Sequence, residues 1–239
     1  MSTTMDKNEV MNWLESHGRE NTVKIYRKHG AEGEMFGVQI ADLKKILKKI
    51  KGEQNLALEL WNTDNSDAMY LAGLVADGAL MTKRQLDHWA KTAWWYMLSE
   101  HSVAGVAAEH KDSVGIAKKW MKSKKENIAS SGWSTYNRVV SIYDDSDLNI
   151  AEVKELVQRA KDEIGDAPNR VRYCMNGFII SAGAYVKPVL KTAKAAAKKI
   201  GKVEVNVGST SCKVPLATEA IAKIEKMGRV GQKRKATKC

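Results

Sequence analysis

Apolar residues recur at helical spacing along nearly the whole chain, and this periodicity limits the fold more than any other feature of the sequence. The clearest stripe is formed by Ile40, Leu43, Ile46, Leu47 and Ile50, which fall on one face of a helix beside a cluster of lysines. Similar stripes continue toward both ends of the chain. The pattern predicts a protein built mainly from amphipathic helices.

Residues that interrupt helices are few. The chain has only three prolines, Pro168, Pro188 and Pro215, and each stands near the start of a predicted helix, where a missing N–H costs little. Strand-like alternation is confined to the short valine-containing segment 203–207, which we interpret as an extended loop. We therefore expect an all-α fold.

Spacing and capping residues place the boundaries of about twelve helices joined by short polar turns. Asp64 or Ser66 is the expected N-cap of one helix, and Thr82 is the expected N-cap of the next. The later helices are predicted at 67–80, 83–91, 94–110, 112–121, 126–143, 150–164, 169–186, 188–200 and 215–227. Helix pairs recur about every 40 residues in HEAT-like repeats. We expect residues 1–228 to form a single domain of such repeats, curved into a solenoid; an irregular helical bundle would give a similar pattern.

The segment 229–239 changes character, because it is basic and almost free of apolar residues. Such a run is expected to be a solvated, disordered tail. Its five basic residues also suit an arm that binds phosphate, and the two roles are compatible.

The charge balance predicts a polyanionic partner. The chain carries 39 Lys and Arg against 28 Asp and Glu, a net charge of +11, and its pI is about 9.4. A protein this basic usually binds nucleic acid or an anionic membrane surface, and charge alone does not choose between them. The lysine clusters at 44–51, 118–125 and 191–202 are either solvated helix faces or the lining of one concave side of a repeat array.

Other sequence features indicate a cytoplasmic protein. No apolar run approaches the roughly 20 residues of a membrane helix, and the polar first residues lack the apolar core of a secretion signal. Cys174, Cys212 and Cys239 are too widely spaced to indicate a disulfide framework or a zinc cluster. The five histidines form no metal-binding pair with nearby carboxylates. We expect a monomer with no metal, no cofactor and no membrane association.

Four segments carry a family resemblance: WWYMLS at 94–99, WSTYNRVV at 133–140, RVRYCMNGF at 170–178, and the long segment 201–231. Together they resemble the DNA alkylation repair enzymes, a family of HEAT-like DNA glycosylases, over nearly the whole chain. In the active branch of that family a Trp and an Asp four residues apart share one helix face, and an Arg and a second Trp follow on later helices. The resemblance implies that the Asp stabilises the cation formed as the glycosidic bond breaks. It also implies that the aromatic rings and the Arg hold the DNA backbone.

Only part of that set is present in this chain. Trp95 matches the first Trp and Arg138 matches the Arg, whereas Ser99 stands at the position of the Asp and Phe178 at that of the second Trp. Glu100 lies five residues after Trp95, about 140° further round an α-helix, so it could replace the acid only through a bulge or a repositioned helix. The resemblance therefore implies a branch that lacks the catalytic Asp and retains DNA contacts through Trp95, Arg138 and Phe178.

The loss of the acid has a predictable chemical cost. A carboxylate about 4 Å from the developing cation is worth on the order of 4 kcal/mol at an effective dielectric of 20, which corresponds to roughly a thousandfold in rate. A serine hydroxyl offers only a dipole. We therefore predict sequence-nonspecific binding of duplex DNA, including alkylated or distorted duplexes, with weak or no base excision.

Two other functions remain open from the sequence. One is an active alkylpurine DNA glycosylase that cleaves the N-glycosidic bond of N3- or N7-alkylated purines. The other is a helical scaffold that binds an acidic protein partner. In the scaffold, Trp95 would be an ordinary core residue, and Arg138 would be solvated or paired with Asp144 or Asp145.

Overall fold

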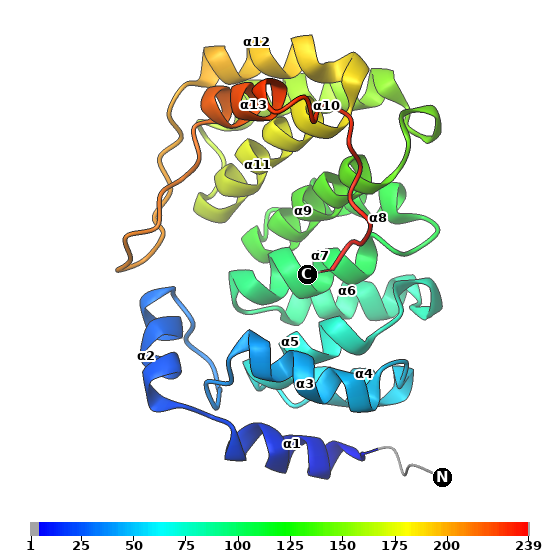
Figure 1. Ribbon diagram of the computed structural model, residues 1–239, viewed down its shortest axis with the longest axis vertical. Helices are drawn as coiled ribbons and strands as arrows, with labels where there is room; N and C mark the ends of the chain where they lie inside the picture. Colours follow the sequence, from blue (N-terminus) through cyan, green and yellow to red (C-terminus); the bar gives the residue numbers. More distant parts are fainter. Residues whose placement is uncertain (1–4, 239) are drawn as a thin grey trace. The chain divides into compact units, whose positions relative to one another are not determined.

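The structure, a computed structural model, describes residues 5–238, and every regular element in that range is helical (Figure 1). The predicted all-α class is confirmed. No helix in the described range is both long enough and apolar enough to cross a lipid bilayer. Cys239 lies outside the described residues.

The helices gather into two compact units. Unit 1 comprises Met1–Lys111, Val207–Ser211 and Lys238–Cys239, and unit 2 comprises Asp112–Asn206 and Cys212–Thr237. The single domain of HEAT-like repeats over residues 1–228, which the helix spacing predicts, stays a prediction. The division arises from how the helices pack, which periodicity does not report.

Unit 1 contains α1 (Lys7–Ser16), α2 (Glu20–Lys28), α3 (Ile40–Ile50), α4 (Gln54–Trp61), α5 (Ser66–Val75), the 3-10 helix η1 (Gly78–Leu80), α6 (Lys83–Thr92), the π-helix η2 (Met97–Val103) and α7 (Ala104–Ala107). The apolar stripe of α3 is buried as predicted, because Leu43, Ile46 and Ile50 are each at most 1% exposed. Its lysines lie at the surface. The helix therefore packs by the face that its periodicity predicts.

Helix capping in unit 1 agrees only in part with the prediction. Thr82 caps α6, since its hydroxyl accepts the N–H of Gln85 at 3.2 Å, and this prediction is confirmed. For α5 the cap is Asn65, whose Oδ1 accepts the N–H of Asp67 at 3.1 Å, so the expected cap at Asp64 or Ser66 is wrong. Asp64 instead adopts the left-handed conformation, with φ of 58°, before the helix.

The buried carboxylate of Asp67 fixes the loop between α2 and α3. Its oxygens accept the backbone N–H groups of Phe36 at 2.7 Å, Gly37 at 2.9 Å and Val38 at 3.0 Å. Burial raises the pKa of the Asp67 carboxyl, and the three N–H donors act in the opposite direction. The carboxylate thus supplies acceptors for three loop amides that no helix satisfies.

The predicted single helix at 94–110 is wrong. The π-helix η2 occupies Met97–Val103, α7 follows it, and Ala93 to Trp95 are not helical. This part of the chain packs closely on α5, because a Cβ added to Gly73 would lie 2.5 Å from the Cβ of Ser102. The π-helix widens the turn with i→i+5 hydrogen bonds, so side chains leave it in directions that differ from those of an α-helix.

Unit 2 contains α8 (Ser113–Trp120), α9 (Glu126–Ile142), the 3-10 helix η3 (Asp145–Asp147), α10 (Ile150–Glu163), α11 (Asn169–Tyr185), the 3-10 helix η4 (Lys187–Val189), α12 (Leu190–Ile200) and α13 (Ala217–Lys226). Helix α9 packs against α8 and α11, and α12 packs against α10, α11 and α13 (Figure 1). These α-helices lie within about two residues of the predicted boundaries. The segment 203–207 is an extended loop, as predicted.

The C-terminal segment differs from the predicted disordered tail. The N–H of Gly231 donates to the carbonyl of Ala184 at 2.8 Å, and the N–H of Arg234 donates to the carbonyl of Ser141 at 2.7 Å. These contacts hold the segment against α9 and α11. Its composition gives no sign of this, because the acceptors belong to helix ends far away in the sequence.

Candidate nucleic-acid interface

Trp95 precedes the π-helix and is anchored inside unit 1. Its side chain is 6% exposed, and its Nε1 donates a hydrogen bond to the carbonyl of His29 at 3.0 Å. The ring centroid of Tyr26 lies 5.1 Å from that of Trp95. The indole is therefore fixed in place, with little of its surface accessible to a ligand.

Ser99 and Glu100 both lie in η2, a few residues after Trp95. Ser99 is 2% exposed, and its hydroxyl donates to the carbonyl of Tyr96 at 3.4 Å. Glu100 is 4% exposed. The π-helix is the kind of departure from α geometry that Glu100 would require, yet neither side chain reaches the accessible surface of unit 1.

Arg138 and Phe178 lie on the packed helices α9 and α11 of unit 2. The Nε of Arg138 donates to the carbonyl of Thr237 at 3.0 Å, and one terminal nitrogen donates to the carbonyl of Ser134 at 3.1 Å. Phe178 is fully buried, with its ring centroid 5.4 Å from Trp133 and 5.8 Å from Tyr136. The ring has no exposed surface and packs in the core of unit 2.

The excess positive charge of the chain belongs entirely to unit 2. Unit 1 has 15 basic residues (Lys and Arg) and 15 acidic residues (Asp and Glu), whereas unit 2 has 24 basic and 13 acidic residues. The net charge of +11 is therefore the charge of unit 2. A positive charge concentrated in one unit is the electrostatic feature of nucleic-acid-binding surfaces.

Much of this charge is accessible. On α12, Lys191, Lys198 and Lys199 are exposed, and Lys194 pairs with Glu225 of α13 at 2.7 Å. The loop after α8 adds exposed lysines at 122, 124 and 125. The sequence identifies these clusters, but only the structure shows that they belong to unit 2 and not to the neutral unit 1.

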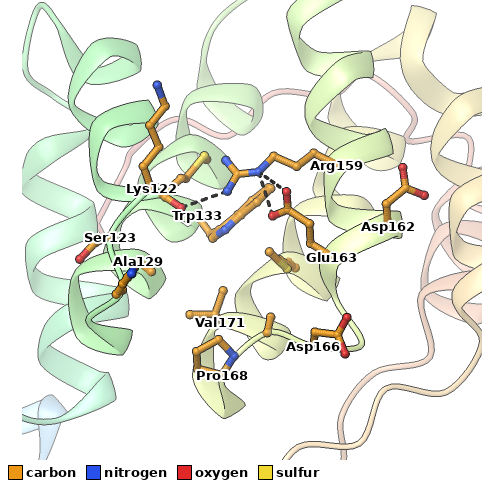
Figure 2. Close-up of a pocket in the computed structure, with 14 residues that line it drawn as sticks. Lys122, Ser123, Ala129, Trp133, Arg159, Asp162, Glu163, Asp166, Pro168 and Val171 are labelled. Atoms are coloured by element: carbon orange, nitrogen blue, oxygen red, sulfur yellow. Dashed lines mark hydrogen bonds and ion pairs between the residues drawn. The ribbon is translucent and has the colours of Figure 1, made fainter.

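A cavity of about 490 Å³ lies between the end of α8 and helices α9, α10 and α11 in unit 2 (Figure 2). Arg159 lies 5.5 Å from the ring centroid of Trp133 and donates from Nε to both carboxylate oxygens of Glu163, at 3.0 and 2.9 Å. Asp162 and Asp166 line the same wall. Lys122 and Lys124 also line the cavity, so acidic and basic side chains are mixed there and its lining is not uniformly basic.

A partly buried acid links α8, α9 and α10 in unit 2. Glu152 accepts a hydrogen bond from the Tyr136 hydroxyl at 2.6 Å and forms an ion pair with Lys118. Burial raises the pKa of the Glu152 carboxyl, but the hydrogen bonds from Lys118 and Tyr136, with the Lys118 charge, together outweigh it. The pKa of Glu152 therefore lies below its ordinary value of 4.5.

Replacing Glu152 with Gln is expected to lower the free energy of unfolding by about 2 kcal/mol at pH 7, because two charge-assisted hydrogen bonds are weakened. A carboxyl whose pKa is lowered by folding stabilises the fold above its unfolded pKa. That stabilisation is lost as the pH falls from about 4.5 through the lower folded value. Urea unfolding at pH 7 and pH 3 should show the gap between wild type and variant narrowing in acid. A gap that stays constant with pH would contradict this assignment.

Comparison with known proteins places the chain in a family. The sequence profile of a family described as "DNA alkylation repair enzyme" matches residues 10–199. The protein Lin0241 of Listeria innocua serovar 6a is 38% identical over 219 residues, which are 89% of this chain and 93% of that protein. Lmo0209 of Listeria monocytogenes serovar 1/2a is 37% identical over 219 residues, with the same coverage of both chains.

A solved structure has the same fold. It has a TM-score of 0.90 and 37% sequence identity, and the match covers 98% of this chain and 100% of that one. It is described as representing a new family of proteins related to the HEAT-like repeat DNA glycosylases, with affinity for branched DNA structures. The predicted HEAT-like helical fold is confirmed. With the family profile matching most of its length, the chain belongs to the DNA alkylation repair enzyme family.

Proposed function

We propose that this protein binds branched DNA through the basic surface of unit 2 and has weak or no base-excision activity. The observation that carries the proposal is the partition of charge: unit 2 holds the whole excess of +11, and unit 1 is neutral. Similarity to a structure from a family with affinity for branched DNA supports the choice of ligand. The proposed binder acts as a cytoplasmic monomer, as the sequence predicts.

Phosphate contacts would supply most of the affinity. Lysines that neutralise phosphates release condensed counterions, so binding should be largely independent of base sequence and should weaken steeply with salt. A junction brings several duplex backbones together and offers more phosphates to one basic surface than a single duplex does. Linear duplexes, including alkylated or distorted ones, would then bind by the same contacts with lower affinity.

The residues at the predicted catalytic position support weak or absent base-excision activity. Ser99 is a buried hydroxyl where the resemblance implies a carboxylate, and Glu100 beside it is also buried. A buried hydroxyl contributes far less than a carboxylate to stabilising an oxocarbenium ion. Because Trp95 is almost covered and Phe178 is fully covered, the proposal assigns DNA contact to basic side chains, Arg138 among them, more than to aromatic rings.

Two assays test this function with the full-length protein. Titration of a labelled four-way junction and of a linear duplex with the same arm sequence should show tighter binding to the junction and a steep loss of affinity with salt. Single-turnover incubation with N7-methylated duplex DNA should release no base above the spontaneous rate. Base release well above that rate would favour the alternative, an active alkylpurine glycosylase. Equal affinity for DNA and for an unrelated polyanion such as heparin would favour the helical scaffold with an acidic protein partner.

A further inference from the structure

The C-terminal strap, residues 228–237, runs along the ends of two helices of unit 2. It begins after α13, donates from the N–H of Gly231 to Ala184 of α11, and then donates from the N–H of Arg234 to Ser141 of α9. Its last residue, Thr237, is 9% exposed and accepts the hydrogen bond from Arg138. These hydrogen bonds join the strap to both α9 and α11.

The strap is held because it satisfies helix ends. The last four carbonyls of an α-helix have no partner within the helix. Ala184, Ser141 and Val140 supply three of these carbonyls, and the amine of Lys233 donates to that of Val140 at 3.1 Å. A positive charge at a helix C-terminus is also favourable to the helix dipole.

An ion pair and a glycine fix the strap more firmly. The amine of Lys233 lies 2.9 Å from Asp145 Oδ1, and these side chains are only 13% and 28% exposed. Gly231 has a positive φ of 80°, and a Cβ added there would lie 2.5 Å from the Lys187 side chain. A non-glycine residue at this position would therefore be strained and would force the strap or the lysine to move.

Lys233 anchors the strap, whereas the other basic side chains of the strap lie at the surface. Arg229, Arg234 and Lys235 are exposed, and none of them forms an ion pair within residues 5–238. Arg234 itself makes the backbone contact to Ser141, and Lys235 follows it, two residues before Thr237, whose carbonyl accepts from Arg138. Two strong cations are therefore presented from a backbone segment fixed at both sides.

We propose that the strap is a built part of the DNA-binding surface, in which Arg234 and Lys235 bind phosphate and Asp145 and Gly231 act as positioning residues. This inference rests on the proposed function of unit 2. A preordered segment loses less conformational entropy on binding than a disordered tail with the same charges. The arrangement predicts that loosening the strap weakens DNA binding without removing any positive charge.

Asp145→Asn separates positioning from charge. The variant loses the ion pair to Lys233, yet Asn retains an oxygen to accept the N–H of Lys187, which Asp145 Oδ2 now accepts at 3.1 Å. The chain becomes more positive, so an effect of charge alone would tighten binding. We expect instead about threefold to tenfold weaker binding to the four-way junction, with faster hydrogen exchange at the amide of Arg234. The matched control is Asp147→Asn, an exposed acid on the same 3-10 helix, which should bind as tightly as wild type or slightly more tightly.

Two further variants decide the inference if Asp145→Asn leaves the strap in place. Gly231→Val changes no charge and should weaken junction binding to a similar extent. Arg234→Gln with Lys235→Gln should weaken it roughly tenfold at 0.1 M salt and lower the salt slope by about two. The control pair is Lys48→Gln with Lys49→Gln on α3 of unit 1.

Wild-type binding whose affinity does not change with salt concentration would refute the proposed function itself. Two outcomes would overturn only the role of the strap. One is salt-dependent wild-type binding that is not weakened in the Arg234 and Lys235 variant. The other is equal affinity of Asp145→Asn and Asp147→Asn for the junction although the amide of Arg234 exchanges faster in Asp145→Asn.

Discussion

A variant with Lys191, Lys198 and Lys199 changed to Gln is expected to bind a four-way DNA junction on the order of 100-fold more weakly than wild type at 0.1 M salt. The three side chains are exposed on α12, in the unit that carries the entire net charge. Each lysine in contact with phosphate releases nearly one counterion, so losing three should lower the slope of log affinity against log salt by about 2.7. Anisotropy titrations at several salt concentrations measure both quantities.

The matched control lies on α3 of unit 1. Lys44, Lys48 and Lys49 are exposed on a similar amphipathic helix, and changing them to Gln removes the same charge from the chain. Because unit 1 has no net charge, this variant should bind within about threefold of wild type. Equal losses in the two variants would show that total charge governs binding and that unit 2 has no special role.

The largest expected effect on stability is at Trp133. Its side chain is fully buried in unit 2, in contact with Phe178 and beneath the guanidinium of Arg159. Trp133→Ala removes an indole from a packed core and should lower the free energy of unfolding by about 3–5 kcal/mol. Urea denaturation followed by circular dichroism measures the loss.

Trp133→Phe is the control for this prediction. The indole Nε1 has no hydrogen-bond partner within residues 5–238, so the smaller aromatic ring removes an unsatisfied donor while keeping most of the contact with Phe178. We expect a loss below about 2 kcal/mol. A loss in the Phe variant as large as that in the Ala variant would contradict the assignment of this stabilisation to buried aromatic surface.

Periodicity predicted much of the fold because most helices bury one continuous apolar face. The stripe of α3 and the boundaries of α9, α10 and α11 follow from spacing alone. The π-helix at Met97–Val103 does not, because an apolar stripe does not distinguish i→i+5 from i→i+4 hydrogen bonding. The order of the C-terminal strap also depends on distant partners, the carbonyls at the ends of α9 and α11.

The candidate site was less predictable than the fold. Matching motifs identified the family, but they gave no information on burial, and Phe178 proves to be a core residue. The lysine clusters were visible in the sequence. The fold divides them, with the cluster at 44–51 in the neutral unit 1 and those at 118–125 and 191–202 in unit 2. Asp145 and Lys233 carried no signal, since an ion pair between residues 88 positions apart has no local pattern.

If unit 2 contacts DNA and unit 1 contributes little to binding, the lysines of the two units should differ in accessibility once a junction is bound. Brief acetylation of the full-length protein, with and without a saturating four-way junction, followed by mass spectrometry, reports the accessibility of individual lysines. We expect strong protection at Lys198, Lys199 and Lys235 and little change at Lys44 and Lys48. Protection spread evenly over both units, or confined to the lysines of α3, would contradict the assignment of DNA contact to unit 2.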